Sequence, residues 1–261
     1  MPEDRPLSGQ PAAPVQAAHP GRLELAWRWT AYGVMPFALA FAVALAVTAC
    51  LQARSPASTN ASAPPGAASA PTLTQMMNLS PLPDRAAPGF TLTDQRGRRV
   101  SLASFRGKTV LLGFFDSRCT QVCPVVAQEL IAAERDLGPR GAGVAFVGVN
   151  VNPQAESVAA VRQFTAVHGL GQLPNWYFLT GTTGQLARVW AAYGIEVQLP
   201  AGGSQTVHGD YLFFINPLGH ERFLAEPFAD QRRDGSGYLP AATITRWGQG
   251  IARYLQQAAA D

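Results

Sequence analysis

The chain has 261 residues, a formal net charge of +3 at pH 7 and 14% charged residues, fewer than the roughly one quarter usual in soluble domains. This length suffices for one well-cored domain with appendages, and the small charge, without a dense run of Lys or Arg, argues against nucleic-acid binding. Only three cysteines occur, Cys50, Cys119 and Cys123, which excludes a disulfide framework and leaves one close pair and one separate cysteine.

The N-terminal part predicts a membrane anchor. Residues 1–28 are polar and contain several prolines, whereas residues 29–51 include no charged side chain. An apolar segment of about 20 residues is long enough to cross the hydrocarbon core of a bilayer as a helix. Arg22 and Arg28 precede this segment and only Arg54 follows closely, so the positive-inside rule places the tail in the cytoplasm and the remaining chain outside it.

Cys50 offers an alternative form of attachment. The sequence Val47-Thr48-Ala49-Cys50 resembles the lipobox of bacterial lipoproteins, in which the signal is cleaved before a cysteine that is then acylated. The preceding segment is long for such a signal, so an uncleaved single-pass anchor is favoured over lipid attachment. Either form would tether the domain to the bacterial inner membrane, facing the periplasm.

Residues 52–87 are rich in Ala, Ser, Pro and Thr and show no periodic apolar pattern, which predicts a flexible linker. A linker of this length would let the domain meet a neighbouring membrane protein. Met76 and Met77 could supply thioether ligands to copper, but the simpler alternative is that they are linker or docking residues.

Residues 88–258 form the predicted globular domain. A hairpin is expected from 90–93 and 99–102, with turn-forming residues between them. The remaining elements are expected as strands at 110–115, 143–149, 176–179, 211–215 and 222–224 and helices at 125–137, 156–168, 185–193 and 243–257. Alternating strands and helices followed by a hairpin and a helix predict an α/β fold with a mixed sheet covered on both faces.

Cys119 and Cys123 lie where a buried strand passes into a helix, near the positive end of the helix dipole. That environment favours the thiolate, which attacks disulfides and binds metals. Two cysteines four residues apart on one helical turn would lie within reach of a disulfide or of one soft metal ion. A purely structural disulfide closing this short loop is the bland alternative, and it would stabilise the fold little.

Several short motifs together resemble the Sco/SenC family of membrane-tethered, thioredoxin-like proteins that carry copper for cytochrome c oxidase assembly. These motifs are Gly89-Phe90-Thr91-Leu92-Thr93-Asp94-Gln95, Phe105-Arg106-Gly107-Lys108, Cys119-x-x-x-Cys123-Pro124, Val207-His208 and Asn216-Pro217-x-Gly219. The resemblance extends over about residues 88–257 and implies a thioredoxin-like fold.

The resemblance implies that the metal ligands are the sulfurs of Cys119 and Cys123 and an imidazole nitrogen of His208. Two thiolates and one imidazole would suit Cu(I) and tolerate Cu(II). The alternative for His208 is a hydrogen-bonded loop histidine without a metal.

The other three histidines fit this ligand set less well. His19 precedes the predicted anchor, His168 stands at a predicted helix end, and His220 lies in a predicted hairpin turn.

The chain departs from the family pattern in two places. Thr120-Gln121-Val122 replaces the proline and aspartate common between the cysteines, and residues 150–156 replace an aspartate-rich stretch. Neither departure removes an implied copper ligand. Both bear on which partner the domain serves.

Two functions compete. The first is a copper chaperone that delivers the ion to cytochrome c oxidase subunit II or to another copper protein. The second is a thiol–disulfide oxidoreductase in which Cys119 and Cys123 are the catalytic redox pair and form a disulfide with each other. Thioredoxin-like reductases use Cys-x-x-Cys and usually place a proline where Val207 and His208 stand, which favours the metal.

A peroxidase, with Arg118 beside the first cysteine, fits the paired cysteines less well. The chaperone itself would need a thiol reductant, because a disulfide cannot bind copper.

Overall fold

The computed structural model describes residues 71–202 and 206–261. The predicted tail (1–28), the predicted anchor (29–51), Cys50 and the first part of the predicted linker lie outside these residues. Among the helices of the described ranges, none combines the length and the apolar character needed to cross a bilayer.

A six-stranded mixed sheet forms the centre of the domain. In spatial order its strands are β1 (Ser80–Ala86), β10 (His220–Ala225), β9 (Leu212–Ile215), β4 (Thr109–Phe115), β5 (Val144–Asn150) and β6 (Trp176–Leu179). Strands β4, β5 and β6 run parallel, whereas β9 pairs antiparallel with β4 and with β10, and β10 pairs antiparallel with β1. This confirms the predicted mixed sheet.

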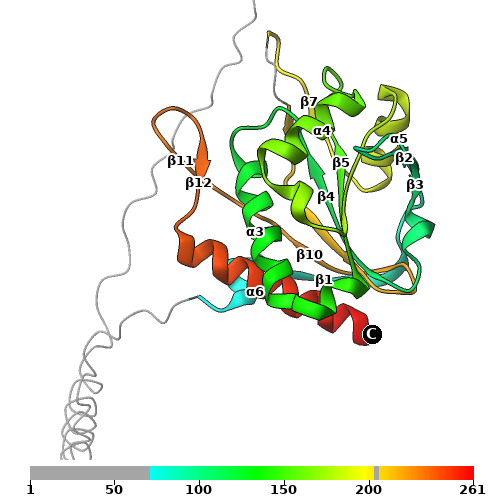
Figure 1. Cartoon of the computed structure of the whole chain (residues 1–261), viewed down its shortest axis with the longest axis vertical. Helices are drawn as coiled ribbons and strands as arrows, with labels where there is room; N and C mark the ends of the chain where they lie inside the picture. Colours follow the sequence, from blue (N-terminus) through cyan, green and yellow to red (C-terminus); the bar gives the residue numbers. More distant parts are fainter. Residues whose placement is uncertain (1–70, 203–205) are drawn as a thin grey trace, which may run out of the picture. The chain divides into compact units, whose positions relative to one another are not determined.

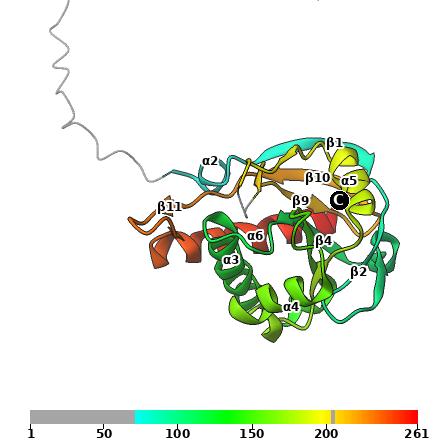
Figure 2. The same ribbon diagram turned by 90° about the horizontal axis from the view of Figure 1, so that it is seen from above.

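Helices and a small hairpin cover the two faces of the sheet (Figures 1 and 2). One face packs against α3 (Val122–Leu137), α4 (Val158–Val167) and α6 (Ala241–Ala260). The other packs against α5 (Thr183–Ala192), the 3-10 turn η1 (Leu102–Phe105) and the hairpin of β2 (Thr91–Thr93) and β3 (Arg99–Ser101). Two further 3-10 turns, η2 (Gly138–Gly143) and η3 (Leu170–Gln172), lead into β5 and β6.

The central strand β4 shows why both faces need cover. Leu111 and Phe115 belong to the core beneath α3, whereas Leu112 and Phe114 belong to the core on the opposite face. Side chains alternate between the faces of a strand, so an apolar residue at nearly every position predicts burial on both sides.

The predicted linker is wrong in its last part. Residues 73–76 form α2 and residues 80–86 form β1, the edge strand of the sheet. Met77 is fully buried, and its sulfur lies against Gly250 of α6. The prolines at positions 81 and 83 argued against a strand in the sequence. An edge strand, however, tolerates residues that lack a backbone N–H donor.

The bounds of several other elements differ from the predicted ones by a few residues, and one of these differences matters for the site. Helix α3 begins at Val122, so Cys123 lies in its first turn, while Cys119 lies in the preceding loop. The prediction that both cysteines share one helical turn is therefore wrong. Two short hairpins were not predicted from the sequence: β7 (Val197–Gln198) with β8 (Val207–His208), and β11 (Asp230–Gln231) with β12 (Gly237–Tyr238).

Candidate metal and thiol site

The two cysteines lie beyond the carboxyl end of β4. The backbone N–H of Cys119 donates to the carbonyl of Asp116 at 3.0 Å, which turns the loop back toward the helix. Cys123 is buried, at 1% exposure, and Cys119 is half-buried. Both are free thiols in this structure, and the Cys119–Cys123 disulfide stays a prediction for the oxidised protein.

The two sulfurs have different acidities. The thiol of Cys123 donates a hydrogen bond to the sulfur of Cys119 and thereby lowers the pKa of Cys119, against the opposing effect of burial. The backbone N–H of Gln121 also donates to this sulfur, at 3.4 Å. For Cys123 the same hydrogen bond, together with burial, raises the pKa well above its usual range. Cys119 is therefore the sulfur that carries the negative charge more readily.

Asp116 ties the cysteine loop to the strand that carries His208. Its buried carboxylate accepts hydrogen bonds through Oδ2 from the backbone N–H of Thr206 at 2.7 Å and from the Thr206 hydroxyl at 3.1 Å. Its Oδ1 accepts from Arg118 N–H at 2.7 Å and from the Asn152 side-chain amide at 2.8 Å. Strand β8 then continues to His208, which pairs with Val197 of β7.

His208 lies close to Cys123, together with Asp210, a residue that was not predicted from the sequence. Cys123, His208 and Asp210 each offer a ligand atom, and these atoms lie within 4.8 Å of one another. The His208 side chain is 5% exposed, and its Nδ1 lies 3.1 Å from the Gly209 carbonyl oxygen. An Nδ1–H that donates to this carbonyl leaves the Nε2 lone pair available for a metal.

Of the three predicted site residues, the structure places Cys123 and His208 in this group of ligand atoms, and Cys119 lies beside the group but is not part of it. Cys119 is joined to Cys123 by their hydrogen bond and lines one pocket together with His208 and Asp210. Burial raises the pKa of the Asp210 carboxyl, and the nearby His208 opposes that effect. The signal in the sequence for Asp210 was an acidic residue two positions after the predicted ligand.

Cys119 also lines a second, wider groove. Phe164 and His168 of the α4 region form part of this groove, and Arg118 and Arg232 are its charged lining residues. His168 stacks on Phe164 with ring centroids 4.3 Å apart, and burial lowers its pKa. Cys119 is therefore reached from this groove, whereas Cys123 is not among the residues that line it.

The β11–β12 hairpin supports the cysteine loop from one side. The N–H of Gly237 donates to the carbonyl of Thr120 at 2.9 Å. A Cβ at this position would overlap the backbone of Gln121, so only glycine permits this approach.

The remaining predicted candidates lie elsewhere. His220 opens β10, and its Nδ1 lies 2.6 Å from Asp84 Oδ1 on β1. His19 lies outside the described residues. Met77 is buried against α6, and Met76 packs against the same core.

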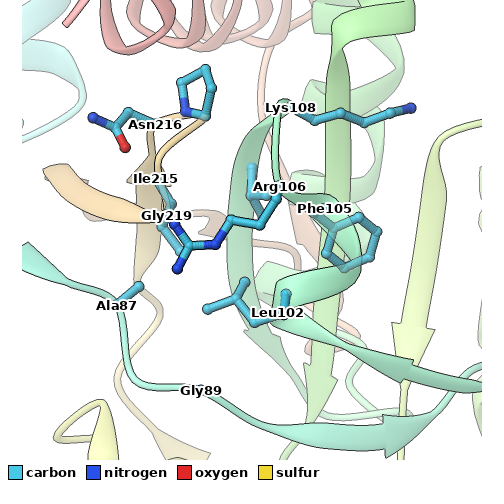
Figure 3. Close-up of a pocket in the computed structure, with 12 residues that line it drawn as sticks. Ala87, Gly89, Leu102, Phe105, Arg106, Lys108, Ile215, Asn216 and Gly219 are labelled. Carbon is cyan, nitrogen blue, oxygen red and sulfur yellow. The ribbon is translucent and has the colours of Figure 1, made fainter.

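A further pocket lies at the other end of β4 (Figure 3). Its lining includes Arg106, Lys108, Asn216 and Gly219 but no cysteine or histidine. Figure 3 shows the Arg106 guanidinium beside Gly219. The 7 residues of β4 span roughly 20 Å, so this pocket is separate from the thiols.

Comparison with known proteins gives the family. The SCO1/SenC family model matches residues 80–233. The chain belongs to this family. The SCO1 protein homolog of Bacillus subtilis is 26% identical over 132 residues, which cover 50% of this chain and 68% of that protein.

Two solved structures agree with the fold. Bradyrhizobium japonicum ScoI with copper bound is 22% identical, with a TM-score of 0.50, and the match covers 66% of this chain and 100% of that one. BsSco is a member of the Sco family of cytochrome c oxidase assembly proteins in which a disulfide switch was identified. It is 22% identical, with a TM-score of 0.52, and the match covers 69% of this chain and 95% of that one. The domain of the SCO1/SenC protein has the expected thioredoxin-like α/β fold.

Proposed function

We propose that this SCO1/SenC protein is a membrane-tethered chaperone that binds copper through Cys119, Cys123 and His208. The observation that carries the proposal is the proximity of the His208 imidazole to the buried thiol of Cys123. Two thiolates and one imidazole form a soft ligand set that suits Cu(I) and accepts Cu(II). The copper bound to Bradyrhizobium japonicum ScoI supports copper as the ion.

The recipient that we propose is the copper centre of cytochrome c oxidase subunit II, with another copper protein as the alternative. BsSco is described as belonging to a family of oxidase assembly proteins. The half-exposed position of Cys119 suits delivery, because a partner thiolate entering the groove can replace one ligand before the others release the ion.

We also propose that the domain faces the periplasm, tethered to the inner membrane by residues 29–51 or by a lipid on Cys50. Mass spectrometry of the mature N-terminus separates the two tethers. An intact N-terminus supports the helical anchor, and a chain that begins at an acylated Cys50 supports the lipid.

Copper titration of the reduced full-length protein tests the binding site. We expect about one copper per chain, and strong weakening in His208→Ala and Cys119→Ser. His168→Ala is the matched control, because His168 lines the groove beside Cys119 but not the pocket that contains His208. Unchanged stoichiometry and affinity in both ligand variants would overturn the assignment.

Thiol–disulfide exchange is the second candidate, favoured by the unequal pair of sulfurs. The Cys119 thiolate would attack a disulfide of the partner, forming a mixed disulfide and releasing one partner thiolate. Cys123 would then lose its proton and displace the second partner thiolate, leaving a Cys119–Cys123 disulfide and a reduced partner. A thiol reductant must restore the dithiol.

A disulfide-reduction assay distinguishes the two functions. His208→Ala should keep the reductase activity if exchange is the function, because neither sulfur is changed, while copper binding falls. If the wild type shows no reductase activity and His208→Ala loses copper binding, the result supports the chaperone.

A further inference from the structure

Asp210 places a carboxylate in the same cluster as two of the proposed copper ligands. Its oxygen, the Cys123 sulfur and a ring nitrogen of His208 lie within 4.8 Å of one another. We propose that Asp210 is an additional, oxygen ligand of this site and that it biases the site toward Cu(II) over Cu(I). This inference rests on the proposed copper-binding function and concerns the choice between the two oxidation states.

The geometry leaves the Asp210 carboxylate available to a metal. Its Oδ1 lies 3.9 Å from Nδ1 of His208, which is too long for a hydrogen bond. Within the described part of the chain, the carboxylate makes no hydrogen bond to another residue. The Asp210 side chain is 29% exposed, so an oxygen can face the pocket without being fully desolvated.

The local backbone directs both side chains into one pocket. His208 and Asp210 are two positions apart, and both line this pocket. Gly209 between them lies against the ring of Tyr211, where a Cβ would overlap the ring. Its carbonyl oxygen contacts Nδ1 of His208, so the residue that orients the imidazole also links it to Asp210.

The negative charge of Asp210 and its oxygen donor both favour Cu(II) over Cu(I). The pocket that contains Cys119, His208 and Asp210 has no Lys or Arg among its lining residues. A carboxylate attracts a divalent ion about twice as strongly as a monovalent ion at the same distance. A carboxylate oxygen is also a harder donor than a thiolate and suits Cu(II) better than Cu(I). Asp210 therefore stabilises bound Cu(II) more than bound Cu(I).

Competition titrations of the reduced full-length protein with Cu(I) and with Cu(II) test this proposal. We expect Asp210→Asn to lose roughly tenfold or more in Cu(II) affinity and much less in Cu(I) affinity. A tenfold difference raises the Cu(II)/Cu(I) potential of the site by about 59 mV. The electron paramagnetic resonance spectrum of the Cu(II) form should change with the loss of the oxygen ligand.

Two variants keep the test specific. Asp230→Asn removes the same charge from an exposed position on β11 and should leave both affinities unchanged. Asp210→Glu retains a carboxylate and should keep part of the preference for Cu(II). Because both ions are measured on the same variant, a general loss of stability would change both affinities and not their ratio.

The outcomes separate this proposal from the proposed function. If the wild type binds copper and Asp210→Asn leaves the ratio of the two affinities unchanged, Asp210 is not a ligand, and the chaperone proposal stands. If the wild type binds neither ion, both proposals fail.

Discussion

The carboxylate of Asp116 holds Thr206 at two points, accepting its backbone N–H at 2.7 Å and its hydroxyl at 3.1 Å. These hydrogen bonds join two segments that are 90 positions apart in the sequence. One segment continues to Cys119 and the other to His208. Asp116 thus links the segment that carries the thiols to the segment that carries the imidazole, and it is not one of the proposed ligands.

Asp116→Ala should therefore weaken both the fold and the site. Removing a buried carboxylate that accepts four hydrogen bonds leaves their donors unsatisfied, and we expect a loss of about 3 kcal/mol or more in the free energy of unfolding. Urea denaturation measures this loss, and copper titration of the folded variant should show weaker binding. Asp230→Ala, at an exposed position, is the control. A copper affinity equal to that of the wild type would show that the two loops hold their positions without Asp116.

The two thiols should react in a fixed order. The pKa of Cys119 is lowered by the hydrogen bond from the Cys123 thiol, so a larger fraction of Cys119 is thiolate near neutral pH. Iodoacetamide labelling at pH 7, followed by peptide mass spectrometry, should modify Cys119 well before the buried Cys123. Cys123→Ala removes the donor, so the pKa of Cys119 should rise and its labelling rate at pH 7 should fall. Earlier modification of Cys123 in the wild type would contradict this order.

The sequence predicted the central sheet well because those strands are continuous apolar runs. The runs that form β4 and β5 are buried at every position, and a short continuous apolar run is typical of a strand buried on both faces. Strands that lack this signal were missed. Strand β1 is largely exposed and contains two prolines, and β8 has only two residues, so neither shows a periodic pattern.

The candidate site was predictable only in part for a similar reason. Cys119, Cys123 and His208 could be selected through the family resemblance, because their residue types suggest metal chemistry. Asp116 could not, because its importance depends on which segments the folded chain brings together, and Asp210 was overlooked although it follows His208 by two positions. An aspartate in a loop is usually solvated, and only the tertiary structure shows that one is buried under Thr206 and another faces His208.

Met77 should matter for stability and not for copper. Its side chain is fully buried and its sulfur lies against Gly250 of α6, so Met77→Ala leaves a cavity between the end of α2 and α6. We expect a loss of about 2–5 kcal/mol in the free energy of unfolding, measured by urea denaturation. Met76→Ala, which truncates a partly buried side chain, should cost less. Copper stoichiometry should stay the same in both variants, and a decrease in a folded Met77 variant would restore the thioether-ligand hypothesis.

Glu129 should make the folded protein less stable as the pH rises. It is fully buried in α3, neither carboxyl oxygen has a hydrogen-bond partner among the described residues, and burial raises its pKa well above the usual range. Between the unfolded and folded pKa values the folded state binds more protons, so the free energy of unfolding falls with increasing pH. The slope in this window approaches about 1.4 kcal/mol per pH unit.

Urea denaturation of the reduced protein at several pH values from 5 to 8 measures this effect. Glu129→Gln removes the ionisable group with little change in shape, so it should flatten the pH dependence and unfold at higher urea than the wild type at pH 8. Glu196→Gln, at an exposed position, should follow the wild-type curve and serves as the control. If Glu129→Gln and the wild type lose stability in parallel between pH 5 and pH 8, then Glu129 is not the group that takes up the proton in the folded state.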